Sequence, residues 1–173
     1  IIYILGETHQ ELGASELSFM LAEETGGGIG NDAPQIDTAR NLTMYRALTA
    51  AMGEGLVRSA HDCSDGGLAV AVAECCFGCD GATTINLDAL VNDNVDEWAA
   101  LFGESLGRIL VTVRPDDAES FESAMSGNAI DRIGTVDNKK TLQFTIGNNT
   151  ILKANLANLI TSWKGTLNMG GGA

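Results

Sequence analysis

The chain passes through Ser59-Ala60-His61-Asp62-Cys63-Ser64-Asp65-Gly66-Gly67 and leads directly into the apolar run Leu68–Ala73. This run would be apolar on every face of a helix, which predicts a helix buried inside the domain. Free backbone N–H groups and the positive end of the dipole favour anions at the start of such a helix. Two interpretations are open. The polar segment holds a phosphate-bearing ligand, or the glycine pair makes a tight turn while Asp62, Ser64 or Asp65 caps the helix.

Hydrophobic patterning predicts further elements on both sides of this helix. Strands are expected at residues 1–5, 83–87, 109–113, 129–136 and 141–146, with a turn at 137–138 joining the last two. Helices are expected at 11–21, 37–58, 95–102 and 153–163, and another opens at residue 115. Interleaved helices and strands predict an α/β (α+β) fold in which helices pack on a mixed sheet.

The clearest of these helices is the one predicted at 37–58. Apolar side chains recur there at steps of three and four residues: Leu42, Tyr45, Leu48, Met52 and Leu56. The short helix at 95–102 has three apolar side chains that are expected to pack inward: Trp98, Leu101 and Phe102.

The length and the net charge of the chain limit the classes of protein to which it can belong. A chain of 173 residues is long enough for one domain with a substantial core, and we expect residues 1–165 to form it and 166–173 to be a flexible tail. The net charge of −13 disfavours nucleic acid and anionic membranes, because both bind clustered Lys and Arg. The chain opens within a predicted strand and without Met, and we therefore expect a fragment of a longer protein.

The four cysteines raise the question of a metal site. They stand at positions 63, 75, 76 and 79. A zinc site needs four convergent ligands, but Cys75 and Cys76 are adjacent and would point about 100° apart on a helix. Reduced, partly buried thiols are therefore the favoured interpretation, and no metal ligand is assigned.

Four stretches carry a resemblance to a known family. They are Ser59–Ala71, Gly6-Glu7-Thr8 with Glu11–Glu16, Leu101–Arg108, and Trp163-Lys164-Gly165. In this order they resemble the synthetase subunit of phosphoribosylformylglycinamidine synthase, of the small, separate-subunit type. The chain resembles the second domain of the second half of that subunit, an AIR synthase-related C-terminal domain. It departs from the pattern at Ala14, where a second glycine is usual, and at Arg40-Asn41, where a Glu-Lys pair is usual.

The resemblance implies a fold and an activity for the complete enzyme. The implied fold is a layered α/β/α domain with a mixed sheet, partly like a ferredoxin fold. The complete enzyme is a ligase of de novo purine biosynthesis in the cytoplasm. It uses ATP and magnesium to convert formylglycinamide ribonucleotide and glutamine-derived ammonia to formylglycinamidine ribonucleotide. Its implied partners are the remaining domains of its own chain, a glutaminase subunit and a small accessory subunit. The domain alone is expected to hold neither cofactor and to be inactive.

Two alternatives to this function stay open. The chain is a nucleotide- or phosphate-binding structural module, or it is the matching domain of a related enzyme. The related enzymes are aminoimidazole ribonucleotide synthetase, selenophosphate synthetase and thiamine-phosphate kinase.

No catalytic residue of the family transfers to a motif in this chain. Ten residues are candidates for ligand or interface contacts: Asp37, His61, Asp62, Ser64, Asp65, Gly66, Gly67, Glu104, Ser105 and Arg108. The resemblance implies that Glu104-Ser105-Leu106 matches a substrate-contacting Glu-Ser-Gln stretch in the first half, with a leucine replacing the glutamine.

Several of these candidates have two possible roles. Asp37 matches a magnesium-binding aspartate of the first half, but it could equally cap the helix that follows. Arg108 could hold a phosphate or pair with Glu104. We expect residues 61–67 to face neighbouring domains, because unpaired carboxylates are costly to bury.

Overall fold

The computed structural model describes residues 1–78 and 81–165. In chain order its elements are β1 (Ile2–Leu5), α1 (Glu16–Thr25), α2 (Thr38–Gly53), β2 (Val57–Asp62), α3 (Gly67–Phe77), β3 (Ala82–Asn86), α4 (Glu97–Phe102), β4 (Ile109–Val113), the short 3-10 helix η1 (Pro115–Asp117), α5 (Ala118–Ala124), β5 (Ile130–Lys139), β6 (Thr141–Ile146), β7 (Asn149–Asn155) and α6 (Leu156–Gly165). The predicted tail at 166–173 lies outside the described residues, and a single domain over 1–165 stays a prediction.

The strands form one seven-stranded sheet in the order β2-β4-β1-β5-β3-β6-β7. Five of the neighbouring pairs are antiparallel, and β3 with β6 is the parallel pair, so the sheet is mixed. The β1 strand lies inside the sheet between β4 and β5 and is buried along its whole length. The β2 and β7 strands form the two edges.

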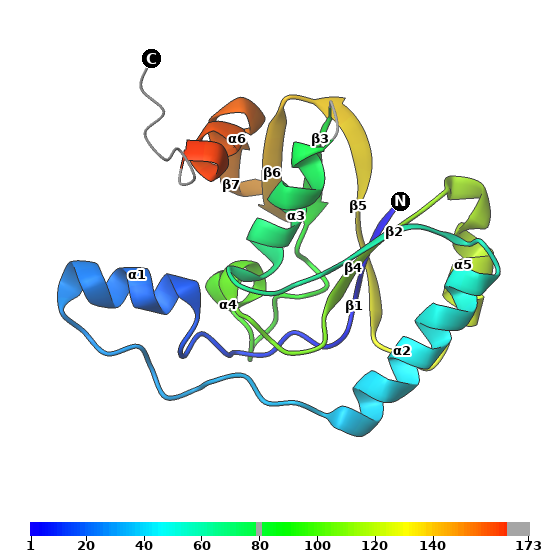
Figure 1. Cartoon of the computed structure of the whole chain (residues 1–173), viewed down its shortest axis with the longest axis horizontal. Helices are drawn as coiled ribbons and strands as arrows, with labels where there is room; N and C mark the ends of the chain where they lie inside the picture. Colours follow the sequence, from blue (N-terminus) through cyan, green and yellow to red (C-terminus); the bar gives the residue numbers. More distant parts are fainter. Residues whose placement is uncertain (79–80, 166–173) are drawn as a thin grey trace, which may run out of the picture.

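Helices cover both faces of the sheet (Figure 1). On one face α3, α4 and α6 pack over a core that includes Ile4, Leu68, Ile85 and Phe144. On the other face α2 and α5 pack over a smaller core, whose largest buried side chains include Tyr3 and Phe121. The predicted layered α/β/α architecture with a mixed sheet is therefore confirmed. Among the described residues, no helix combines the length and the apolar character that a membrane crossing requires.

The region from 54 to 62 differs from its prediction. The long helix ends at Gly53 instead of Arg58, and Gly55 takes the left-handed conformation, with φ 77°. The chain then forms the edge strand β2, which pairs with β4. The first residues of the polar segment thus belong to a strand rather than to a loop. Two glycines close together end the helix, because they destabilise a helix and permit the turn.

The face that α2 buries also differs from the expected one. Its buried side chains are Met44, Leu48 and Ala51. Of the side chains expected on one face, Leu42, Tyr45 and Met52 are exposed instead. The sequence pattern is ambiguous here because apolar residues occupy two adjacent strips of the helix, and only one strip contacts the sheet.

Helix α1 begins later than predicted, at Glu16 instead of Glu11. Ser15 is its N-cap, and its hydroxyl oxygen accepts a hydrogen bond from the N–H of Ser18 at 3.2 Å. The α1 helix has no fully buried residue, and Phe19 and Met20 are exposed. The start of α1 is therefore set by the Ser15 cap, because this helix has no buried apolar face that could set it.

Three predictions in the C-terminal half are wrong. The β5 strand continues through Asp137 and Asn138, where a turn was expected. The β7 strand was missed, and α6 begins at Leu156 rather than at Lys153. Trp98 was expected to point inward but is 52% exposed, with its ring 6.0 Å from that of Phe102.

Candidate functional site

A pocket of about 510 Å³ lies at the start of α3, and we call it the signature pocket. Its lining residues come from four segments: Pro34, Tyr45, Asp62, Cys63, Ser64, Asp65, Glu104, Leu106, Gly107, Arg108 and Ile109. The fold thus brings the turn between β2 and α3 against the loop between α4 and β4. Five of the predicted candidates, Asp62, Ser64, Asp65, Glu104 and Arg108, meet here.

The glycine pair makes the tight turn that the sequence suggested. Gly66 and Gly67 both have positive φ angles, 77° and 64°, which side chains other than glycine rarely adopt. The N–H of Gly67 donates to the carbonyl of Ser64 at 3.0 Å and closes the turn. A Cβ on Gly67 would lie 2.5 Å from the carbonyl oxygen of Gly103, so the two loops touch backbone to backbone.

The carboxylates of the turn do not cap α3. The N-cap is Gly66, which makes no side-chain capping hydrogen bond. Ser64 donates its hydroxyl proton to the carboxylate of Asp62, and this bond lowers the pKa of Asp62. Asp62, Ser64 and Asp65 are all exposed, so they point into the pocket or into solvent. The capping interpretation is wrong for these three residues.

Glu104 joins two helix starts. One carboxylate oxygen, Oε1, accepts hydrogen bonds from the N–H of Gly66 at 2.8 Å and from the N–H of Glu16 at 2.9 Å. A carboxylate at a helix start is favourable because it faces the positive end of the dipole. Glu104 therefore holds α1 and α3 together at the rim of the pocket.

Arg108 is the buried cation beside the pocket, with 1% of its surface exposed. Its guanidinium donates to the carbonyl of Gly103 and to the hydroxyl of Thr8, the latter at 3.2 Å. No salt bridge with Glu104 is formed within the described part of the chain. Burial lowers the pKa of Arg108, while Cys63, Glu11 and Glu104 oppose this shift. Its Nε is buried and lacks a hydrogen-bond partner among the described residues.

Ser105, His61 and Asp37 lie away from the signature pocket. Ser105 is fully buried, and its hydroxyl accepts from the N–H of His9 at 3.1 Å, so it anchors the N-terminal loop. His61 lies on the opposite face of β2 from Asp62, because successive side chains of a strand alternate. Its Nε2 is 3.1 Å from Oε2 of Glu74 on α3, beside Trp163 in a separate pocket of about 630 Å³.

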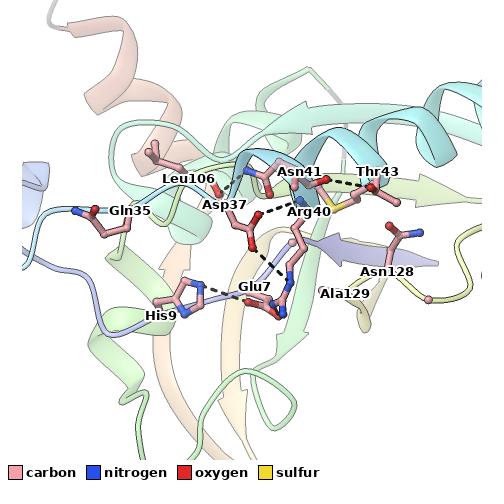
Figure 2. Close-up of a pocket in the computed structure, with 14 residues that line it drawn as sticks. Glu7, His9, Gln35, Asp37, Arg40, Asn41, Thr43, Leu106, Asn128 and Ala129 are labelled. Carbon is pink, nitrogen blue, oxygen red and sulfur yellow. Dashed lines mark hydrogen bonds and ion pairs between the residues drawn. The ribbon is translucent and has the colours of Figure 1, made fainter.

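Asp37 lies in a neighbouring pocket of about 530 Å³ at the start of α2, which Figure 2 shows. Its Oδ1 accepts from the N–H of Arg40 at 3.0 Å, so the capping role is confirmed. Its other oxygen is 3.7 Å from Nε of Arg40, and the same guanidinium bonds to Glu7. In the sequence, Arg40 stands out only as a departure from the family pattern. Glu7 lies 3.6 Å from His9, which makes this pocket a small charge network.

The cysteines form no metal cluster in residues 1–78 and 81–165, where no three His, Cys, Asp or Glu side chains are grouped to hold an ion. Burial raises the pKa of the Cys63 thiol to about 11, which keeps it protonated at neutral pH. Cys79, the fourth ligand that a zinc site would need, lies outside the described residues.

Comparison with known proteins places this geometry in a family. A family model described as AIR synthase related protein, C-terminal domain, matches residues 1–147. Among solved structures, Thermotoga maritima PurL complexed with FGAR is similar, with a TM-score of 0.77 and 19% identity over 92% of this chain and 27% of that chain. The PurL of the same organism complexed with ATP gives a TM-score of 0.68 and 18% identity over 92% of this chain and 25% of that chain.

A HypE chain in a HypE–HypF complex is also similar, with a TM-score of 0.62 and 16% identity over 90% of this chain and 51% of that chain. At these identities the solved structures share the fold. The chain spans about a quarter of the length of the PurL chains it matches. Because the family model covers most of the sequence, the chain belongs to the family of AIR synthase related protein C-terminal domains.

Proposed function

We propose that this chain is the C-terminal domain of the second half of a phosphoribosylformylglycinamidine synthase. That enzyme converts formylglycinamide ribonucleotide, ATP and glutamine-derived ammonia to formylglycinamidine ribonucleotide in de novo purine biosynthesis. In this proposal the complete enzyme, in the cytoplasm, holds ATP and magnesium. A glutaminase subunit supplies the ammonia, and a small accessory subunit is the other partner in the complex. The domain alone is inactive and supports the other domains of its polypeptide.

One observation carries the proposal. Three of the four stretches that resemble the synthase converge on Glu104 and Arg108. Thr8 bonds to Arg108, while the N–H groups of Glu16 and Gly66 both bond to Glu104. The residues that carry the resemblance therefore form one hydrogen-bonded cluster at the signature pocket. The histidine of the signature stretch lies outside this pocket, since His61 faces Glu74 instead. This arrangement supports a positioning role rather than a catalytic centre.

The first experiment tests activity. The protein encoded by the complete reading frame should form the amidine from formylglycinamide ribonucleotide, ATP, Mg²⁺ and ammonium, which bypasses the glutaminase. The 173-residue chain under the same conditions should release no phosphate from ATP. No amidine from the complete protein, or phosphate release by the chain alone, would contradict the proposal.

A pair of substitutions in the complete protein tests the role of the pocket. Asp65→Ala should impair domain assembly or nucleotide retention and leave this domain folded, because the exposed Asp65 makes no described hydrogen bond that the fold needs. His61→Ala is the matched control and should retain turnover. If Asp65→Ala instead unfolds the 173-residue chain, the residue is structural. Complete loss of turnover in His61→Ala, with normal assembly and ligand binding, would assign that histidine a chemical role.

A second candidate function, a phosphate-binding module, rests on Arg108. Its buried Nε has no partner among the described residues, and it lines a pocket beside the open start of α3. The carboxylates of Asp62 and Asp65 line the same pocket and oppose an anion. Calorimetric titration of the chain with inorganic phosphate distinguishes the phosphate-binding module from the synthase domain. Binding that is lost in Arg108→Lys, while the fold persists, would favour the module.

A further inference from the structure

A strip of apolar side chains on α2 lies uncovered next to the signature pocket. Leu42, Tyr45 and Met52 are 47%, 37% and 42% exposed, and they recur at helical spacing on one side of α2. Leu106, from the loop between α4 and β4, is 48% exposed. We call these four residues the α2 patch. A single exposed apolar residue is ordinary, but several exposed apolar residues on one side of a helix are typical of a face that packs against another surface.

The four residues belong to one surface. Tyr45 and Leu106 both line the signature pocket. The side-chain amide of Asn41 donates to the carbonyl of Leu106 at 3.4 Å, so the loop lies against the first turns of α2, next to Leu42. Figure 2 shows Leu106 and Asn41 side by side. The patch therefore runs along α2 and continues into the mouth of the signature pocket.

Charge restricts what can cover this surface. The signature pocket, which adjoins the patch, is lined by three carboxylates, those of Asp62, Asp65 and Glu104, and by one cation, Arg108. The chain carries a net charge of −13, so two copies approaching through this acidic face would repel each other. A partner with an apolar centre and basic groups at its rim would match both parts of the surface. The charge therefore disfavours a second copy and favours a partner that presents Lys or Arg.

We propose that the α2 patch and the signature pocket form one docking surface for another domain of the same polypeptide. That domain places apolar side chains against α2 and a Lys or Arg side chain between Asp62 and Asp65. The inference rests on the proposed function and deepens it by naming the surface and the chemistry of its partner. PurL chains of this fold are about four times as long as this chain, so such a polypeptide has other domains available.

Hydroxyl-radical footprinting tests the apolar part without a mutation that could unfold the protein. The 173-residue chain and the protein from the complete reading frame are labelled in parallel, and modification is measured by mass spectrometry. Labelling of Leu42, Tyr45 and Met52 should fall by about tenfold in the complete protein, since the centre of an interface is fully buried. Equal labelling of the patch in both proteins would overturn the proposal.

Carbodiimide cross-linking tests the basic part. In the complete protein, Asp62 or Asp65 should form an amide with a lysine of another domain. An arginine cannot form this link. If the entering side chain is an arginine, Asp65→Lys should instead restore hydroxyl-radical labelling of Tyr45 in the complete protein. Val136→Lys, at a side chain 61% exposed on β5, is the matched control and should leave the protection intact. If Tyr45 stays protected from labelling in Asp65→Lys and no cross-link forms, the proposal of a Lys or Arg between Asp62 and Asp65 is refuted.

The outcomes separate this proposal from the proposed function. A complete protein that forms the amidine but leaves the patch labelled would overturn the docking surface alone. A protected patch in a complete protein without amidation would overturn the function alone. Protection in the 173-residue chain that grows with concentration, with a dimer in sedimentation, would assign the surface to a second copy and refute the proposal.

Discussion

Replacing Gly67 by alanine should destabilise the domain strongly, because two separate costs act at one position. Gly67 has φ 64°, and a residue with a side chain in that region costs about 1–2 kcal/mol. Its Cβ would also lie 2.5 Å from the carbonyl oxygen of Gly103 and 2.9 Å from the carbonyl carbon of Phe102. Both contacts are with backbone, which cannot rotate away, and overpacking of this kind costs about 1–3 kcal/mol.

The two costs together predict a loss of about 2–5 kcal/mol in the free energy of unfolding, against a total of about 5–15 kcal/mol for a typical domain. The measurement is urea-induced unfolding of the 173-residue chain, followed by far-ultraviolet circular dichroism and extrapolated to water.

Two matched variants separate the costs. Gly55→Ala places a side chain at φ 77° where no atom lies within 4 Å, so it should show the backbone cost alone. Gly53→Ala, in the last turn of α2 with nothing within 4 Å, should be neutral or stabilising by up to about 1 kcal/mol. If Gly67→Ala proves no more destabilising than Gly55→Ala, the close approach of the two loops is refuted.

Three further predictions concern titration, thiol reactivity and metal. Burial and the 2.6 Å hydrogen bond to Glu122 raise the pKa of Tyr3 to about 12 from 10.0, so folding favours its protonated form. The free energy of unfolding should therefore fall as the pH rises from about 10 to about 12, and a Tyr3→Phe variant that retains this fall would contradict the assignment. Cys63, buried and with its pKa raised to about 11, should react with iodoacetamide at neutral pH far more slowly than the exposed Cys75, as peptide mass mapping would measure. Zinc chelators should leave the thermal midpoint unchanged, and stoichiometric zinc in protein purified without added metal would overturn that expectation.

Local patterns in the sequence determined several elements correctly. The apolar run after the glycine pair forms the buried helix α3, because a segment without a polar face has no stable position at the surface. The strand at 109–113 is observed over that range, and Asp37 caps α2 as its position before the helix suggested. The tight turn at the glycine pair, one of the two interpretations open from the sequence, is also formed, with positive φ angles at Gly66 and Gly67. These properties depend on residues a few positions apart.

The tertiary structure decided what depends on distant segments. The sequence could not show which of two apolar strips of α2 meets the sheet, and the structure buries Met44 and Leu48 while exposing Tyr45. It could not show that β2 pairs with β4, or that this pairing turns His61 away from the signature pocket. Glu104 lies 38 residues from Gly66 in the chain, yet its carboxylate holds the N–H of that turn. Strand pairing and long-range hydrogen bonds are fixed by the packing of the whole domain, and therefore no local pattern specifies them.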